Sequence, residues 1–225
     1  MSNRSNRIIF WDWNGTLLDD VQVCVKSINH LLKKRNLPIL DLTGYREVFT
    51  FPVRHYYEEL GFDFTAETFE KPAREFMDIY IKNLEKTDLH IKAYETLQYF
   101  QSNGYKQYII SAMEHNMLTD LVQKFGIVGF FEKVIGITDI YANGKLHMAE
   151  TLYNSLNAKP EEIFFVGDTL HDYEVASHFG FQAVLLSHGH QSTGRLKSSG
   201  ALVKNGFSEL ISVIDDHFGK NKKAV

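Results

Sequence analysis

The chain has 225 residues, of which 44% are hydrophobic and 23% charged, which is ordinary globular composition and allows one α/β domain with an insertion. The formal net charge of −4 excludes a broad basic surface for nucleic acid, and the first apolar run, Ile8–Trp11, is too short for a membrane span. The one cysteine, Cys24, excludes an internal disulfide, so we expect a cytoplasmic protein in which this residue packs in a core.

Short apolar runs alternate with helical patterns along the chain. The expected strands are Ile8–Trp11, Gln107–Ile110, a weaker Lys133–Ile137, Ile163–Val166 and Ala183–Leu186. The expected helices are Val21–Lys34, Lys92–Asn103, Met117–Phe125, Met148–Leu156, Tyr173–Phe179 and Ser208–His217. This alternation predicts an α/β fold with a doubly wound parallel sheet that is covered by helices on both faces.

The spacing of the first two strands predicts an insertion. The first strand ends near Asp12 and the next begins near Gln107, and the sequence between them has helical periodicity. Compact domains rarely contain a structureless loop of that length. We therefore expect a small α-helical domain at residues 19–87, inserted into an α/β core of residues 1–18 and 88–225.

Polar side chains follow the expected strands at their carboxyl ends, where open α/β sheets bind ligands. The first strand leads to Asp12, the second to Ser111, and Ile163–Val166 leads to Asp168. Lys145 is expected at the start of the helix that precedes Ile163–Val166. Carboxylates and phosphate oxygens are ligands that Mg²⁺ prefers, and a lysine neutralises phosphate charge. The set therefore predicts a site for Mg²⁺ and a phosphate group.

Each of these residues also has a simpler interpretation. Asp12 could be a turn or capping aspartate, and Asp172 a carboxylate that stabilises a helix N-terminus. Ser111 could cap a helix, and Lys145 could lie on the surface in solvent. The functional interpretation is favoured because the residues occur together.

Four motifs in the chain resemble those of the haloacid dehalogenase superfamily. The first is Ile9–Leu17 and the fourth is Val166–Asp172, while Ile109–Ser111 and Gly144–Lys145 resemble the second and third. They occur in the family's order and span most of the chain. The insertion matches the helical cap of phosphoglycolate-phosphatase-like members. The resemblance implies a Rossmann-like core and a Mg²⁺-dependent phosphatase of a small phosphorylated metabolite, and it leaves the oligomeric state open.

The resemblance also implies a role for each matched residue. Asp12 would be the nucleophile that forms an aspartyl-phosphate. Asp12, the main-chain carbonyl of Asn14 and Asp168 would bind Mg²⁺, and Asp172 would support the metal site.

Ser111 and Lys145 would hold the transferring phosphoryl group. The expected phosphate-binding set also includes Gly15, Thr16 and Ala112, and Arg54 of the cap is expected to contact the rest of the substrate.

Asn14 departs from the family pattern, because family phosphatases usually carry an aspartate there that protonates the leaving oxygen and later activates water. An amide is neither an acid nor a base near neutral pH. Three alternatives follow: a slow phosphatase or one suited to good leaving groups, another proton donor such as His171, Asp19 or Asp20, or a phosphometabolite-binding or regulatory protein without turnover. An engineered substitution is a further alternative. The phosphonate-cleaving branch also lacks this acid, but the cap lysine on which it relies is not identified.

Overall fold

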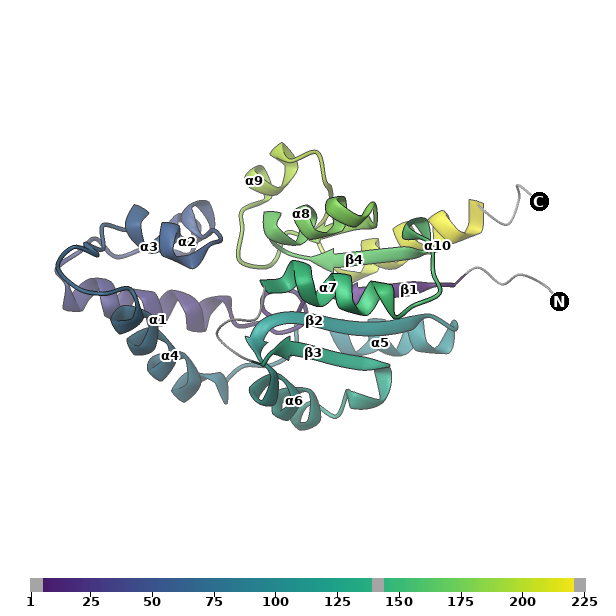
Figure 1. Ribbon diagram of the computed structural model, residues 1–225, viewed down its shortest axis with the longest axis horizontal. Helices are drawn as coiled ribbons and strands as arrows, with labels where there is room; N and C mark the ends of the chain where they lie inside the picture. Colours follow the sequence, from purple (N-terminus) through teal and green to yellow (C-terminus); the bar gives the residue numbers. More distant parts are fainter. Residues whose placement is uncertain (1–5, 139–143, 221–225) are drawn as a thin grey trace.

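The computed structural model describes residues 6–138 and 144–220. In these residues one fully parallel sheet has the strand order β3-β2-β1-β4-β5-β6 (Figure 1). The strands are β1 (Ile8–Trp11), β2 (Lys106–Glu114), β3 (Lys133–Ile137), β4 (Ile163–Gly167), β5 (Gln182–Leu186) and β6 (Leu202–Lys204). The order changes direction between β1 and β4, so the predicted doubly wound sheet is confirmed.

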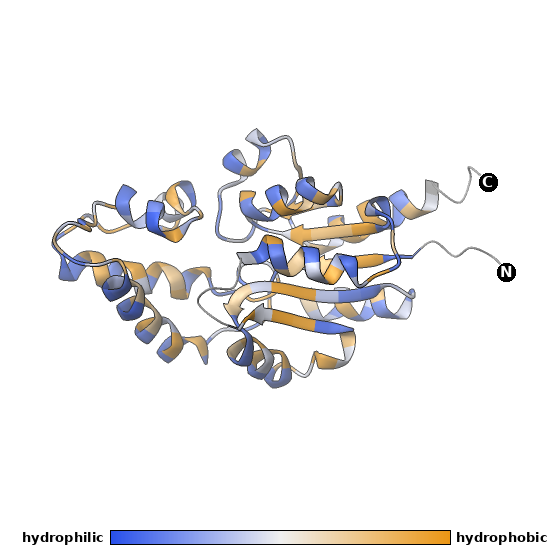
Figure 2. Cartoon of the chain, viewed as in Figure 1, coloured by the Kyte–Doolittle hydropathy of each residue, from blue (hydrophilic) through white to orange (hydrophobic). Residues whose placement is uncertain are grey.

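The sheet has a hydrophobic core on each face. Ile9 and Trp11 of β1 belong to the core shared with α5 (Ala93–Ser102) and α10 (Phe207–Lys220). The alternate residues of β1 and β4 face α7 (Gly144–Asn154) and α8 (Leu170–Phe179). Figure 2 shows the hydrophobic colouring of the central strands between these helices. Burial on both faces explains why the strands read as continuous apolar runs.

The register brings the ends of the two central strands to the same level. Trp11 pairs with Ile109 of β2 and with Val166 of β4. The Asp12 amide then donates to the Val166 carbonyl at 2.8 Å. Residues that directly follow β1 and β4 therefore start side by side.

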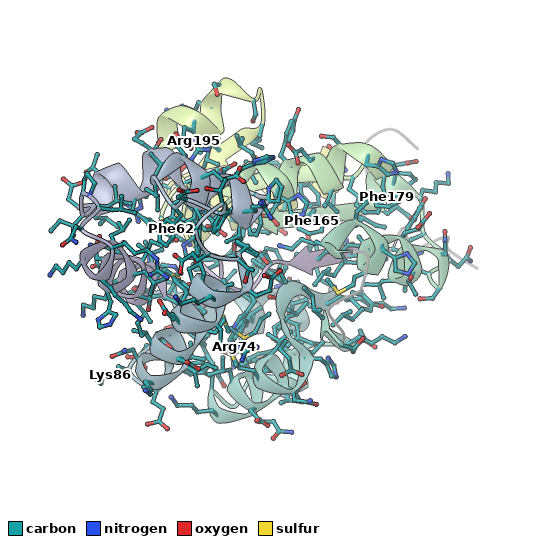
Figure 3. The ribbon with its side chains drawn as sticks, turned by 60° about the vertical axis from the view of Figure 1, so that its left-hand side comes forward. Phe62, Arg74, Lys86, Phe165, Phe179 and Arg195 are labelled. Atoms are coloured by element: carbon teal, nitrogen blue, oxygen red, sulfur yellow. The ribbon has the colours of Figure 1, made fainter. Side chains whose placement is uncertain are left out.

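Four helices lie beyond the carboxyl ends of the strands: α1 (Val21–Lys34), α2 (Leu42–Val48), α3 (Val53–Glu59) and α4 (Glu70–Leu84) (Figure 1). They fall within the expected insertion, and we call them the α1–α4 segment. Its two connections to the sheet run together, because Leu18 bridges Leu89 and the Asp19 amide donates to Asp88 at 2.9 Å. Aromatic rings fill its interior, including Phe62, which stacks on Tyr57 at 4.8 Å (Figure 3).

Several elements differ from the prediction. The short β6 and α9 (Thr193–Ser198) were not predicted, because the three residues of β6 are partly exposed and form no distinct apolar run. Strand β2 continues past Ile110 through an irregular register, so Ser111 lies within the strand. Helix α6 (His115–Lys124) begins two residues earlier than predicted, because Glu114 caps it by accepting from two amides. Within the described ranges, the helices are too short or too polar to cross a bilayer.

Candidate active site

Three buried carboxylates meet at the ends of β1 and β4. Ligand atoms of Asp12, Asp168 and Asp172 all lie within 4.8 Å of one another. Asp12 directly follows β1 and Asp168 follows β4, and Asp172 lies in the first turn of α8. The structure therefore brings together the three acidic residues that the sequence analysis selected.

Lys145 lies between two of these carboxylates. Its Nζ is 2.5 Å from Asp12 Oδ1 and 2.7 Å from Asp172 Oδ1, and all three side chains are almost fully buried. Burial opposes a charged ammonium, but Asp12 and Asp172 outweigh it and raise the pKa of Lys145 above its ordinary value. The lysine therefore remains a cation at the site, and the surface alternative is wrong.

The acidic cluster disfavours full ionisation in the absence of a further cation. Burial raises the pKa of Asp12 well above its ordinary value, and the nearby Asp172 and Asp168 add to this against the effect of Lys145. Burial also raises the pKa of Asp168 to about 6. Buried carboxylates that repel one another are stabilised by a bound divalent cation, so the donor set is chemically suited to one.

Asp168 is held in place from both sides. It accepts a hydrogen bond from Thr16 Oγ1 at 2.8 Å and from the His190 amide at 2.6 Å. Gly15 has a φ of +72°, and a Cβ there would lie 2.4 Å from Asp168 Oδ2. A Cβ at Gly189 would lie 2.1 Å from the same oxygen. The close approach of both backbones to Asp168 requires glycine at these positions.

Asp172 serves the helix and the site together. Its Oδ2 accepts from the Asp168 amide and from the amide and hydroxyl of Thr169, which completes a capping box at the start of α8. Its Oδ1 accepts from Lys145. The two interpretations of Asp172 from the sequence are therefore compatible, with one oxygen for each.

The amides expected to bind phosphate are already engaged. The Gly15 amide donates to Asp20 Oδ1 at 2.9 Å, and the Thr16 amide donates to the Trp13 carbonyl at 3.3 Å. Both amides close the turn after β1, and their role in phosphate binding stays a prediction. Ser111 is fully buried, and its Oγ accepts from the Met113 amide at 3.1 Å.

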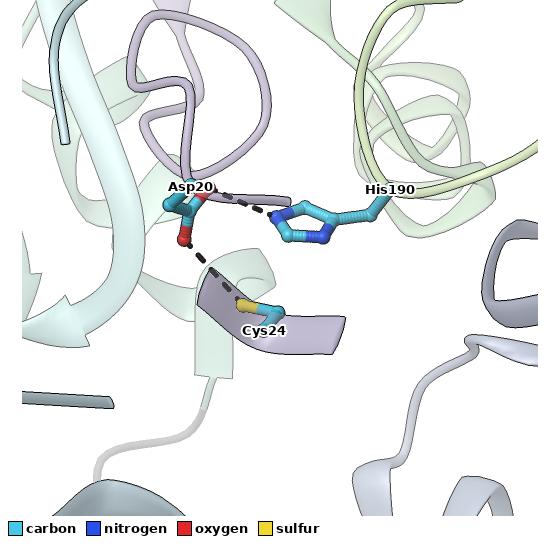
Figure 4. A group of neighbouring side chains, drawn as sticks. All are labelled: Asp20, Cys24 and His190. Carbon is cyan, nitrogen blue, oxygen red and sulfur yellow. Dashed lines mark hydrogen bonds and ion pairs between the residues drawn. The ribbon is translucent and has the colours of Figure 1, made fainter. Parts of the chain in front are cut away.

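A buried polar network surrounds Asn14. Its Nδ2 lies 2.8 Å from Asp20 Oδ2 and 2.8 Å from the Tyr80 hydroxyl, which donates to the same carboxylate at 2.7 Å. His190 Nε2 lies 3.2 Å from Asp20 Oδ1, and Cys24 contacts Oδ2 from the other side (Figure 4). Asp20 therefore fixes the orientation of the Asn14 amide.

The centre of this network is an ion pair. Burial would raise the pKa of Asp20, but the charge and hydrogen bond of His190 outweigh it and hold the pKa at about 2. Burial would lower the pKa of His190, but Asp20 raises it to about 9. Asp20, Cys24 and His190 could contact a cation, but the two Asp20 oxygens already accept from several donors. The group is a hydrogen-bonded network.

The three proton donors named as alternatives to residue 14 lie in different places. Asp20 lines the cavity described below. Asp19 is exposed and faces His90 at 3.8 Å. His171 faces Glu174 at 3.4 Å at the start of α8. His190, which sequence reasoning missed, lines the cavity as well, because a loop 22 residues after Asp168 returns to the site.

A cavity of about 460 Å³ opens between the strand ends and the α1–α4 segment. Asp12, Asn14, Lys145 and Ala112 line it on the sheet side. Arg54 is not among its lining residues, because the guanidinium pairs with Glu58 at 3.0 Å on the surface of α3. The structure thus brings together the predicted site residues of the core and leaves Arg54 outside.

Hydrogen bonds hold helix α2 against the sheet domain. Arg46 donates to the carbonyls of Gly189 and His188, at 2.9 and 2.5 Å. Arg195 of α9 donates to the Phe49 carbonyl at 2.6 Å, and Figure 3 shows its place beside the α1–α4 segment. These contacts keep the aromatic side of the cavity over the carboxylate cluster.

Comparison with known proteins gives a consistent result. The family model described as haloacid dehalogenase-like hydrolase matches residues 8–186. The chain is 25% identical over 225 residues to the pyrophosphatase PpaX of Oceanobacillus iheyensis, covering 95% of this chain and 99% of that protein. It is 23% identical over 218 residues to a phosphoglycolate phosphatase of Aquifex aeolicus, covering 94% and 98%.

Solved structures show the same fold. A haloacid dehalogenase-like family hydrolase of Streptococcus pneumoniae has a TM-score of 0.78 and 18% identity, covering 92% of this chain and 98% of that chain. The resemblance predicted from the four motifs is confirmed by the family match, and the predicted fold by the structures.

Proposed function

Because the chain belongs to the haloacid dehalogenase-like hydrolase family, we propose that it is a Mg²⁺-dependent phosphohydrolase of a small phosphate monoester. The observation that carries this proposal is the buried Asp12 carboxylate at the end of β1, held by Lys145 beside Asp168. The curated relatives are named as phosphatases or as a pyrophosphatase, which supports the same reaction class.

The metal site would use Asp12, Asp168 and the main-chain carbonyl of Asn14, with Asp172 as support. Bound Mg²⁺ would offset the charge of the carboxylates and polarise the phosphoryl oxygens. Residues 19–87 would act as a cap that excludes bulk water from the reaction.

Asp12 would attack phosphorus through one carboxylate oxygen. The new bond forms between that oxygen and phosphorus, the bond from phosphorus to the alcohol oxygen breaks, and the departing alkoxide takes a proton from water. Water then attacks the aspartyl-phosphate, which releases phosphate and restores the carboxylate. Lys145, with Nζ at 2.5 Å from Asp12 Oδ1, would orient the nucleophile and stabilise the transferred group.

The second step would be the slow one. Asn14 donates through Nδ2 to Asp20 and cannot accept a proton from the attacking water. A positioned general base contributes about 10²–10⁴ in rate, and this contribution is missing at residue 14. With a good leaving group, the aspartyl-phosphate should therefore accumulate.

The test is phosphate release from a panel of phosphate monoesters with Mg²⁺, with intact-mass spectrometry of the protein. We expect slow release and a phosphorylated adduct, both lost in Asp12→Asn. The matched control is Asp216→Asn, an exposed carboxylate of α10 outside the cavity lining, which should keep the activity. If no ester gives phosphate release or an adduct, the enzyme proposal is refuted and a phosphate-binding protein is favoured. Calorimetry with inorganic phosphate would then detect the binding.

A further inference from the structure

The geometry points to a substrate class for this site: a phosphate monoester of an uncharged, apolar aromatic alcohol, in place of one that carries a second anionic group. The inference rests on the proposed function, because it concerns the part of the same substrate that leaves with the alcohol oxygen.

The wall of the cavity opposite the carboxylates is apolar. The α1–α4 segment, from Val21 to Leu84, contributes only apolar or aromatic side chains to the lining. The aromatic members include Phe49, Tyr56, Phe69 and Phe76. Aromatic side chains contact one another edge to face and stacked, and they favour a ring as the ligand.

The cations that line the cavity already have partners. Lys145 is bound to Asp12 and Asp172, and His190 is paired with Asp20. The remaining charged residue of the lining, Glu114, is itself an anion. A carboxylate or a second phosphate on the substrate would therefore be buried without a counter-ion, which is strongly unfavourable.

The arginines and lysines of the α1–α4 segment do not supply a counter-ion. Arg54 pairs with Glu58, and Arg46 donates to main-chain carbonyls of the sheet domain. Arg74 is exposed, and so is Lys86 just after α4, which Figure 3 shows at the edge of the molecule. Phosphoglycolate and pyrophosphate, for which the relatives are named, do not fit this end of the cavity.

One buried group in the wall lacks a partner. Tyr56 is 2% exposed, and its hydroxyl makes no hydrogen bond to any residue that the structure describes. Burial raises the pKa of Tyr56 above its ordinary range, so the hydroxyl stays neutral. An unpaired buried hydroxyl is unfavourable until a ligand meets it, so a neutral polar substituent on the ring would be accepted here.

The volume supports the same class of ligand. About 460 Å³ lies within the range of pockets that enclose drug-sized molecules. The two-carbon glycolate group would leave most of the aromatic wall uncovered, whereas a ring would contact it.

Benzyl phosphate and phosphoglycolate test the inference, because they differ by a phenyl ring in place of a carboxylate. With Mg²⁺ we expect kcat/KM to be higher for benzyl phosphate by about tenfold or more, mainly through KM. Calorimetry with the stable analogues phenethylphosphonate and phosphonopropionate should show the same order in Kd.

The binding experiment separates this inference from the proposed function. Tighter phenethylphosphonate binding without phosphate release from any ester would uphold the cavity assignment and refute the phosphatase. Equal or tighter phosphonopropionate binding, or no binding of either analogue, would overturn the assignment whatever the turnover.

A charge placed in the wall gives a second test. Met77 lines the cavity on α4 and is 39% exposed, so Met77→Arg should fold and shift the preference toward phosphonopropionate by about tenfold. Ile81→Arg is the matched control, because Ile81 is 44% exposed on the same helix and outside the lining. An equal shift in both variants, or none in Met77→Arg, would overturn the inference.

Discussion

Replacing Asn14 by aspartate should restore activity at a cost in stability that depends on pH. The new carboxylate would stand where Nδ2 now lies, 2.8 Å from Asp20 Oδ2. The negative charge of each carboxylate is shared between its two oxygens, so we take the charges to be about 4 Å apart. At an effective dielectric constant of 20 they repel by about 4 kcal/mol. Since 1.36 kcal/mol is one pKa unit, this is roughly a thousandfold in proton affinity. His190 keeps Asp20 ionised, so the proton would reside on residue 14.

The protonated carboxyl group could serve as the missing acid, so phosphate release by Asn14→Asp should rise by about 10²–10⁴ near neutral pH. A folded-state pKa raised above the unfolded value means that stability falls as pH rises between the two. Relative to the unsubstituted chain, Asn14→Asp should therefore lose about 1.5 kcal/mol of stability at pH 5, which lies about one unit above the unfolded pKa, and about 4 kcal/mol at pH 8, in urea unfolding.

A double-mutant cycle with Asp20→Asn isolates the repulsion. In the double variant an amide faces the new carboxylate, so the two changes together should cost about 4 kcal/mol less than the sum of the single changes at pH 8. Additive costs, or a stability loss in Asn14→Asp that is equal at pH 5 and pH 8, would refute the contact between residues 14 and 20. No gain in turnover would refute the account of Asn14 as a missing acid/base.

Three further outcomes are expected. Because the folded-state pKa of His190 is about 9, above its ordinary 6.5, its stabilisation should be complete below pH 6.5 and fade as pH rises through 9; urea unfolding at pH 6, 7.5 and 9 should show a fall that His190→Gln removes. Tyr56→Phe should raise the free energy of unfolding by about 1 kcal/mol, measured by thermal unfolding, because it removes an unpaired buried hydroxyl; a loss would show a hidden partner. Millimolar Mg²⁺ should raise the Tm, and Asp168→Asn should abolish the rise; an unchanged rise would place the ion elsewhere.

The sheet could be predicted because its strands are buried on two faces. Ile8–Trp11 and Ile163–Val166 are continuous apolar runs, and both are strands in the centre of the sheet. Strand β6, at the edge, has three residues that are only partly buried, so local pattern carries little signal there. Of the helices in the insertion, α1 was predicted with the bounds that the structure gives, whereas α2, α3 and α4 were not predicted individually. Short helices such as α2 depend on tertiary contacts, so their local pattern is weak.

The site was predictable to the extent that strand topology determines it. Asp12 and Asp168 had to meet, because both directly follow adjacent parallel strands. His190 lies in a loop whose path depends on contacts with the α1–α4 segment, so no local signal marked it. Arg54 was expected to contact the rest of the substrate, but the sequence does not show which way a side chain of a short helix points, and the structure pairs the guanidinium with Glu58.

Two parts of the chain determine two different properties of the site. The carboxylates and Lys145 lie at the ends of the sheet strands and on α7 and α8, and in the proposed function they carry the hydrolysis. The opposite wall of the cavity comes from the α1–α4 segment, which contributes Phe69, Phe76 and Met77 among others. At 23–25% identity, the relatives support the first property more directly than the second. Substrate names therefore transfer poorly, and the charge and shape of the insertion are the better guide to specificity.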